Sequence, residues 1–351
     1  MIYISDNDVK NIIQDNIDLV VEVMKECFIA ISNKDYSLSG RFGSSHGARI
    51  SYKKQDKERM FIAMPGYLGG SFNITGMKWH GPMLKLVDSN KESNYLLVLN
   101  DSYSGIPLAI MDANLITQYR TAAVSLLAAM FLAQKEAKSL AIIGPGVINT
   151  LITTGILNHF KGIKDIFVKG RGKKSIDVFV KNIQDKYKDV KIHIVSKVED
   201  AVKDADIVSI NTLLSFDKIS DMPFVKKDWM KPKSLFLCSA FAHFPDSVLV
   251  NGSNKVCDLF AMYESYENEL GFPAYKYAGF IGNKFADLYL EGKIKKSDIF
   301  DIGEIITKKN HTKDNDLPTI FSSSGLSLED LALGFNVYQK AKELKIGHKI
   351  F

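Results

Sequence analysis

Residues 139–150 read SLAIIGPGVINT, and residues 164–174 read KDIFVKGRGKK. The first segment opens with an apolar run that ends at Gly144-Pro145-Gly146. The second opens with an apolar run that ends in a basic turn. A strand, a glycine turn, a helix and a second strand in this order are typical of a dinucleotide-binding unit. The two segments therefore predict an α/β fold with a Rossmann-type, doubly wound parallel sheet.

The turn at Gly144 and Gly146 suits a pyrophosphate. Glycine lets the backbone approach the phosphates, and amides at the start of the following helix stabilise their charge. Asn149 replaces the third glycine of the usual fingerprint, so that the motif becomes G-x-G-x-x-N. This departure weakens the motif, because a third small residue normally lets the helix pack closely on the strand. The strand before the turn and the helix and strand after it still provide the required context.

The basic turn after the second strand indicates which dinucleotide is bound. NAD sites usually place Asp or Glu there to bind the ribose 2′-hydroxyl, whereas Arg or Lys suits a 2′-phosphate. The residues here are Lys169, Gly170, Arg171, Lys173 and Lys174, with no carboxylate before Asp177. The alternative is an ordinary solvated turn. We predict NADP(H) rather than NAD(H), bound in part by Gly170, Arg171, Lys173 and Lys174.

The composition is that of an ordinary globular protein and excludes several classes of function. The chain has 351 residues, of which 46% are hydrophobic and 24% charged, and its net charge is +5. No dense basic stripe interleaved with aromatic residues is present, which argues against nucleic-acid binding. The three cysteines have no metal-ligand spacing and suit reduced core thiols, so we predict no metal site.

The same sequence predicts a cytoplasmic protein with no membrane partner. The N-terminus lacks the basic and apolar regions of a signal peptide. The longest apolar run, residues 122–133, is too short to span a bilayer.

Periodicity predicts the remaining elements. Residues 6–30 carry helical periodicity, and residues 327–344 predict a helix. Short alternating runs at 49–52, 60–64, 74–79 and 95–100 predict an antiparallel sheet. A helix beginning at Asp112 or Asn114 is predicted to reach about residue 136 and to be apolar on nearly every side after Thr121. From residue 140 onward, strands alternate with helices, as in a parallel sheet.

Three cations in the first part of the chain are candidates for substrate binding. Arg120 lies in a helix that becomes wholly apolar at the next residue, where an unpaired charge is costly. Lys78 stands in GMKWHG at the end of an expected strand, and Arg49 stands in SSHGAR. In the simpler interpretation, each of them is an exposed cation or donates a hydrogen bond to a carbonyl at a helix end. The alternative is that they converge on a substrate carboxylate.

Five segments follow one another along the chain: GMKWHGP, VLNDSYSGIPLAIMDANLITQYRTAA, LAIIGPG, ADIV and FSSSGLSLEDLALGFNVYQKAKELKIG. Together they resemble the ornithine cyclodeaminase/mu-crystallin family, and the resemblance covers nearly the whole chain. Residues 101–123 and 323–347 are its most specific parts. The segments SSHGAR, FIAMPGYLGG, KWHG, IIGPGV and KGRGKK resemble a subgroup of the family that is labelled as a component of tyramine oxidase.

The resemblance implies a homodimer and a division into two domains. Residues 1–125 and 318–351 would form a substrate-binding and dimerisation domain, and residues 126–317 an inserted NAD(P)-binding domain. It also implies roles for individual residues. Arg49, Lys78 and Arg120 match cations that bind the substrate α-carboxylate, with Lys78 also near the reacting carbon. The pyrophosphate would lie on Gly144, Pro145, Gly146, Val147 and Ile148, and Asn211 and Thr212 would line the cofactor.

One loop departs from the family's pattern. Cyclodeaminases carry an aspartate in a G-G-D-type loop after a strand of the nucleotide domain. Here the loop reads CSAFAHFPD, with Ala242 or His243 at the matching place and Asp246 displaced. His243 suits a general acid near neutral pH, and a structural histidine is the alternative.

We therefore predict an NADP(H)-dependent oxidoreductase of a small amino or imino acid. Its catalytic residues would be Lys78 and His243. The first alternative is a cyclodeaminase-like ammonia lyase that uses NAD catalytically. The second is a non-catalytic NADPH-binding protein that assists another enzyme.

Overall fold

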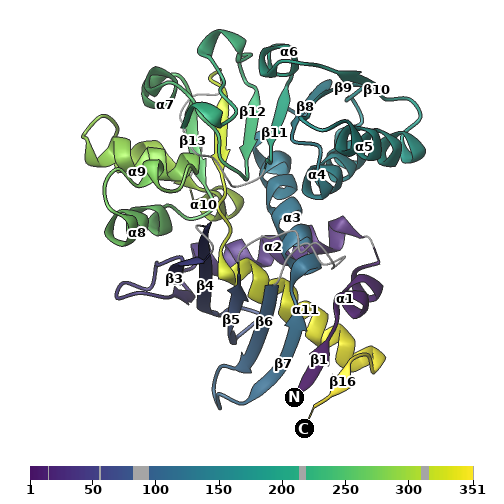
Figure 1. The fold of residues 1–351 in the computed structure, drawn as a ribbon, viewed down its shortest axis with the longest axis vertical. Helices are drawn as coiled ribbons and strands as arrows, with labels where there is room; N and C mark the ends of the chain where they lie inside the picture. Colours follow the sequence, from purple (N-terminus) through teal and green to yellow (C-terminus); the bar gives the residue numbers. More distant parts are fainter. Residues whose placement is uncertain (15, 55–56, 82–94, 213–218, 310–315, 351) are drawn as a thin grey trace. The chain divides into compact units, whose positions relative to one another are not determined.

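The computed structural model describes residues 1–14, 16–54, 57–81, 95–212, 219–309 and 316–350 (Figure 1). The chain forms two compact units. The first contains Met1–Arg120 and Leu326–Phe351, and the second contains Thr121–Gly325. The second unit is thus inserted into the sequence of the first, and helix α3 (Asn114–Leu132) carries the chain from one to the other.

The first unit is built on a mainly antiparallel sheet. Its strand order is β16-β1-β7-β6-β5-β4-β2, and β3 pairs with β4; only β1 and β7 are parallel neighbours among these pairs. The strands are β1 (Ile2–Ile4), β2 (Tyr36–Leu38), β3 (Ala48–Lys54), β4 (Lys57–Leu68), β5 (Ile74–His80), β6 (Tyr95–Asp101), β7 (Pro107–Asp112) and β16 (His348–Lys349). The antiparallel sheet predicted from four alternating runs is confirmed.

Helix α11 (Ser327–Leu344) packs on β4, β5 and β6, and also against α2 (Ile17–Ser32). Figure 1 shows α11 in yellow along the sheet of its unit. Gly76 in β5 permits this packing, because a Cβ there would overlap both the Val98 carbonyl oxygen and the Leu331 side chain. The close approach brings residues at the start of α11 to the strand that carries Lys78.

The helical periodicity of residues 6–30 is divided between two helices in the structure. Helix α1 (Asp6–Ile13) ends where Gln14 takes a left-handed conformation with φ +51°. Helix α2 then begins after Asn16, whose side chain accepts a hydrogen bond from the Leu19 N–H. Apolar periodicity continued through this junction because both helices turn a buried face inward, so the break depends on local caps rather than on the pattern.

The second unit contains a parallel sheet in the order β10-β9-β8-β11-β12-β15-β13-β14, and each neighbouring pair is parallel. Its strands are β8 (Ser139–Ile143), β9 (Asp165–Lys169), β10 (Lys191–Ile194), β11 (Ile207–Ile210), β12 (Leu235–Cys238), β13 (Asn254–Cys257), β14 (Ile299–Asp301) and β15 (Thr319–Ser322). The chain moves outward from β8 in one direction through β9 and β10, and then in the other from β11. Ligands of such sheets bind where the strand order reverses, which here is the β8–β11 pair.

The helices of the second unit, after α3, are α4 (Val147–His159), α5 (Lys173–Lys186), α6 (Val198–Val202), α7 (Asp246–Asn251), α8 (Phe260–Leu270), α9 (Ile281–Leu290) and α10 (Ile302–Ile306). Short 3-10 helices lie at Ile219–Asp221, Lys227–Trp229, Ala274–Lys276 and Lys296–Asp298. Every residue of β8, β11, β12 and β15 is buried, as expected for central strands of a parallel sheet covered on both faces. The predicted Rossmann-type fold is confirmed.

Helix α3 has the length and apolar character of a membrane-crossing segment, with a mean hydropathy of 1.4 over its most apolar window. However, 67% of that window is buried within the protein. This burial is typical of a core helix, which is what the sequence predicted for an element apolar on nearly every side.

Candidate functional site

The glycine turn lies at the carboxyl end of β8, at the point where the strand order of the second unit reverses. Gly144 has φ +89°, a conformation that side chains rarely adopt, and a Cβ there would overlap the Asn211 carbonyl oxygen. Gly146 begins α4 without a side-chain cap, and a Cβ there would meet no atom within 4 Å. The amides of Val147 and Ile148 belong to the first helical turn and have no acceptor within the helix. Backbone donors beneath open space fit a pyrophosphate.

The basic turn follows β9 next to the glycine turn. The Gly144 N–H donates to the Lys169 carbonyl at 2.9 Å, and a Cβ on Gly170 would lie 2.9 Å from Pro145. Gly172 caps α5 without a side chain, and Arg171, Lys173 and Lys174 are exposed. The structure thus places the predicted phosphate contacts at the start of a second helix, beside the first.

Asn211 and Thr212 follow β11 on the other side of the glycine turn. The Asn211 N–H donates to the Ile143 carbonyl at 3.0 Å, and the Thr212 methyl would lie 3.1 Å from a Cβ on Gly144. The Asn211 side-chain nitrogen is buried and has no hydrogen-bond partner in the part of the chain that the structure describes. The cofactor residues predicted in the second unit therefore border one edge of its sheet.

Two of the three candidate cations meet in a buried ion cluster in the first unit. Lys78 on β5 is 2% exposed, and its Nζ lies 3.0 Å from each carboxylate oxygen of Asp330. Arg120 on α3 is 6% exposed; its Nε donates to Asp330 Oδ1 at 3.1 Å and its guanidinium to Glu329 Oε2 at 2.8 Å. Asp330 therefore bonds both cations at once, from the first turn of α11.

The charge of Arg49 acts on a histidine, His46, that the charges of Lys78 and Arg120 also reach. Burial is the main reason that the pKa of His46 falls to about 3, and the charges of Arg49, His80, Lys78 and Arg120 lower it further. These four groups must therefore lie close enough to His46 for their charges to act on it. Lys78 on β5 and Arg120 on α3 therefore share Asp330, whereas Arg49 on β3 is half-buried and is linked to them through its electrostatic effect on His46.

The pKa values in the cluster show how far burial opposes its positive charge. Burial lowers the pKa of Lys78 from 10.5 to about 8, although the contact with Asp330 counteracts the fall. Burial also opposes the charge of Arg120, but Asp330 and Glu329 outweigh it and raise the pKa. Burial and the charge of Lys78 lower the pKa of His80 to about 4. At neutral pH the cluster therefore holds an ammonium close to its titration point beside two neutral imidazoles.

An aromatic ring completes this environment. Lys78 Nζ lies 5.1 Å from the centre of the Tyr95 ring, and the His80 ring meets the same tyrosine edge to face at 5.2 Å. Cation–π contacts of this kind stabilise a desolvated ammonium.

Sequence reasoning missed Glu329, Asp330, His46, His80 and Tyr95. Glu329 and Asp330 were visible as adjacent acids at an expected helix start, where carboxylates are common for reasons of the helix dipole. Two buried cations without nearby acids in sequence were the signal that distant carboxylates must compensate them.

His243 is held by packing within the second unit. Its ring stacks on Phe224 at 5.1 Å, and its Nδ1 lies 3.3 Å from the Tyr275 hydroxyl. Burial, with the charge of Lys284, lowers its pKa, and Asp246 counteracts this. Asp246 itself is paired with Lys284 at 2.9 Å. These contacts suit a structural histidine, and the catalytic role of His243 stays a prediction.

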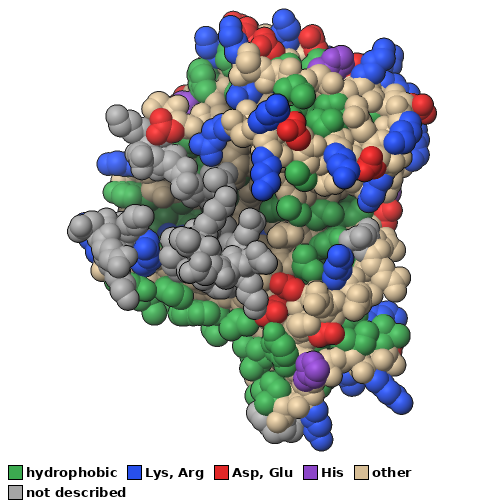
Figure 2. Space-filling model, turned by 45° about the vertical axis from the view of Figure 1, so that its right-hand side comes forward, with side chains coloured by type: hydrophobic (Ala, Val, Ile, Leu, Met, Phe, Trp, Pro, Cys, Tyr) green, Lys and Arg blue, Asp and Glu red, His purple; other side chains and the backbone are tan. Residues whose placement is uncertain are grey.

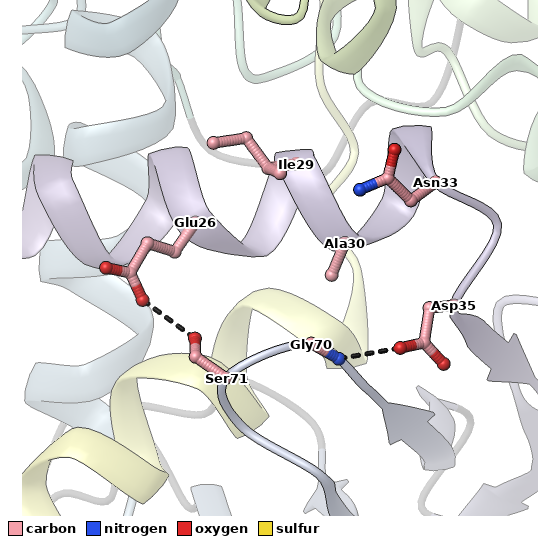
Figure 3. Close-up of a pocket in the computed structure, with 7 residues that line it drawn as sticks. All are labelled: Glu26, Ile29, Ala30, Asn33, Asp35, Gly70 and Ser71. Atoms are coloured by element: carbon pink, nitrogen blue, oxygen red, sulfur yellow. Dashed lines mark hydrogen bonds between the residues drawn. The ribbon is translucent and has the colours of Figure 1, made fainter.

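A pocket of about 250 Å³ lies in the first unit, between the end of α2 and the turn after β4 (Figure 3). It is lined by Glu26, Ile29, Ala30, Asn33, Asp35, Gly70 and Ser71. Its two carboxylates are bonded to the turn: Ser71 donates to Glu26 at 2.8 Å, and the Gly70 N–H to Asp35 at 2.7 Å. None of the predicted site residues lines this pocket.

Positive and negative side chains alternate on one face of the second unit. Figure 2 shows Lys and Arg side chains interspersed with Asp and Glu over the visible face of the second unit. Within the described residues, no group of three or more His, Cys, Asp or Glu side chains is placed to hold a metal ion.

Comparison with known proteins identifies the family. The sequence profile of the ornithine cyclodeaminase/mu-crystallin family matches residues 13–345, so the chain belongs to this family. One relative, N-((2S)-2-amino-2-carboxyethyl)-L-glutamate dehydrogenase of Staphylococcus aureus, is 24% identical over 99% of this chain and 97% of its own. Another, Delta(1)-pyrroline-2-carboxylate reductase of Bacillus cereus, is 25% identical over 100% of this chain and 99% of its own.

A solved structure confirms the fold. Thermococcus litoralis Delta(1)-pyrroline-2-carboxylate reductase, in complex with NADH and L-proline, matches with a TM-score of 0.79 at 22% identity, and both chains are covered to 100%. The relatives named above are a dehydrogenase and reductases by name, which agrees with the predicted class of enzyme.

Proposed function

We propose that this protein is an NADP(H)-dependent oxidoreductase that interconverts an α-imino acid and the corresponding amino acid. The observation that carries the proposal is the buried ion cluster in which Lys78 and Arg120 share Asp330 and burial lowers the pKa of Lys78 to about 8. A perturbed lysine among convergent cations suits both binding of a carboxylate and transfer of a proton. The names of the relatives support the same chemistry.

Arg49, Lys78 and Arg120 would bind the substrate carboxylate, which would share these cations with Asp330. NADPH, when bound, would supply a hydride to the α-carbon of the C=N group, so that imino acid, NADPH and a proton give amino acid and NADP⁺. Lys78 would donate that proton to the nitrogen. A group with a pKa near the working pH is an efficient proton donor, because it is both available and acidic enough.

The cofactor contacts are proposed from the second unit. The turn Gly144-Pro145-Gly146 and the amides of Val147 and Ile148 would hold the pyrophosphate, and Asn211 and Thr212 would lie beside the nicotinamide half. Arg171, Lys173 and Lys174 would bind the 2′-phosphate, and Gly170 would let their turn pack closely against Pro145 of the pyrophosphate turn. The charge of this turn favours NADPH over NADH.

The division of labour between units follows from these assignments. We propose residues 1–125 and 318–351 as the substrate-binding and dimerisation domain, and residues 126–317 as the cofactor domain. We also propose that the protein is a cytoplasmic homodimer. One structural relative, an archaeal alanine dehydrogenase, is described as a dimer with bound NAD, and its match has a TM-score of 0.76 at 20% identity.

The test is a spectrophotometric assay with Delta(1)-pyrroline-2-carboxylate and a panel of other imino acids. Net loss of reduced nicotinamide absorbance supports the proposal. Ammonia release from a diamino acid without net absorbance change would instead indicate a lyase, and tight NADPH binding without turnover would indicate an accessory protein. Lys78→Met should lower kcat/KM by at least about a hundred-fold. Lys53→Met, which removes an exposed lysine from β3, is the matched control and should behave like the wild type.

Cofactor preference is tested separately. Arg171→Ala should weaken NADPH binding about ten-fold and leave NADH binding unchanged, because only the 2′-phosphate is lost as a partner. Lys186→Ala, at the far end of α5, is the control for a general loss of positive charge. Equal effects of Arg171→Ala on both cofactors would contradict the assignment.

A further inference from the structure

Asn149, at the place of the missing third glycine, lies completely buried in the first turn of α4. Its side-chain nitrogen donates to the Gly144 carbonyl at 2.8 Å and to the Ile143 carbonyl at 3.2 Å. Its side-chain oxygen accepts a hydrogen bond from the Ser209 hydroxyl at 2.6 Å. The amide is therefore fully engaged on both sides, as a buried polar group requires.

These bonds join three segments that border the proposed pyrophosphate site. Ile143 ends β8, Gly144 opens the turn, and Ser209 lies within β11, which pairs with β8 in parallel. The bridge thus spans the two strands at which the strand order reverses. Glycine, the residue of the usual fingerprint, offers no side chain to form it.

The bridge also limits how the turn can move. The Gly144 carbonyl accepts a second hydrogen bond from the Gly146 N–H at 2.8 Å, while the backbone of Gly144 rests against Asn211. Asn149 holds the same carbonyl from the helix side. Because α4 carries Asn149 and also presents the amides at its start, the bridge couples the position of those amides to the two strands.

We propose that Asn149, with Ser209, is a positioning residue for the cofactor: it sets the distance and orientation of the α4 N-terminus relative to β8 and β11. In this fold the usual third glycine achieves close packing by having no side chain. Here a polar bridge does the same work. Asn149, which weakens the match to the glycine motif in the sequence, therefore replaces the third glycine in positioning the helix. The inference rests on the proposed function, because the effect of Asn149 is measured as the affinity for NADPH.

The experiment measures NADPH binding by nicotinamide fluorescence in Asn149→Gly, which restores the usual fingerprint. We expect binding about ten-fold weaker than in the wild type, on the scale of a lost buried hydrogen bond with one partner left unsatisfied. KM for NADPH should rise by a similar factor while kcat changes less, a split that a merely structural role would not produce. Thr153→Val is the matched control: Thr153 is buried one turn later in α4, and its hydroxyl donates to the Asn149 backbone carbonyl at 2.7 Å.

Equal or tighter NADPH binding by Asn149→Gly would overturn the inference. If Asn149→Gly does not fold, Ser209→Ala gives the same test: binding about three-fold weaker supports the bridge, and unchanged binding overturns it. The double variant Asn149→Ala/Ser209→Ala should bind no more weakly than Asn149→Ala alone, because the two side chains act as one unit. Failure of the wild type to bind NADPH or NADH would refute the proposed function, and the inference with it.

Discussion

Neutralising Asp330 is the sharpest test of the ion cluster. In Asp330→Asn, a side chain of the same shape loses the negative charge that bonds Lys78 at 3.0 Å and Arg120 at 3.1 Å. Asp330 is completely buried, so water cannot replace the lost contacts. Removing one partner from a buried ion pair typically costs about 3–5 kcal/mol. We expect the free energy of unfolding at about pH 7 to fall by this amount.

The loss should depend on pH in a defined direction. Folded Lys78 releases its proton near pH 8, whereas an unfolded lysine holds it until about 10.5. Between these values the unfolded chain binds more protons, so this group makes the wild type more stable as pH rises. Above pH 8, Lys78 is neutral and is no longer stabilised by the charge of Asp330. The difference in the free energy of unfolding between wild type and Asp330→Asn should therefore shrink. A residual difference should remain, because Arg120 keeps its charge.

The assay is urea unfolding followed by tryptophan fluorescence. The chain has two tryptophans, Trp79 beside Lys78 and Trp229 in the second unit. A Trp229→Phe background therefore makes the signal report on the first unit, where the cluster lies. Glu329→Gln is the matched control: it neutralises the carboxylate that bonds Arg120 at 2.8 Å, and the expected loss is about 1–3 kcal/mol. A loss for Asp330→Asn no larger than for Glu329→Gln, or one that does not change with pH, would refute the reasoning.

Three further predictions concern activity and the turn. The rate of imine reduction should fall as pH rises through about 8, because Lys78 loses its proton there. The rate should not fall near pH 6, because the pKa values of His46 and His80 lie at about 3 and 4. A pH–rate profile checks both expectations. Gly144→Ala should lower both Tm and NADPH affinity, because Gly144 has φ +89°, which alanine rarely adopts. Gly146→Ala should keep the wild-type Tm and lower only NADPH affinity, because a Cβ at Gly146 meets no protein atom within 4 Å. Thermal melts with and without NADPH check both variants. His243→Gln should leave kcat within about two-fold, because the ring packs on Phe224 and Lys78 supplies the proton; a hundred-fold fall in kcat would contradict this and favour His243 as the general acid.

The sequence alone predicted the features that depend on a few neighbouring residues. The strand, glycine turn and helix around Gly144 were readable because a positive φ and a close backbone approach require glycine locally. The alternating runs of the first unit were readable because strand periodicity is a local property. The family followed from ordered motifs along the chain. The tyramine oxidase subgroup, the choice of NADPH, the carboxylate-binding roles and the dimer stay predictions.

Other features were decided by tertiary structure. The cations at Lys78 and Arg120 were visible, but their partners lie 252 and 210 residues away on α11, and no local pattern links them. Asn149 illustrates the same limit within a motif. In the sequence, Asn149 is visible only as the absence of a glycine. Its hydrogen bond to Ser209, 60 residues away on a neighbouring strand, becomes visible only in the fold. Conformation is encoded by adjacent residues, whereas compensation of a buried charge or amide depends on which distant group the fold brings to it.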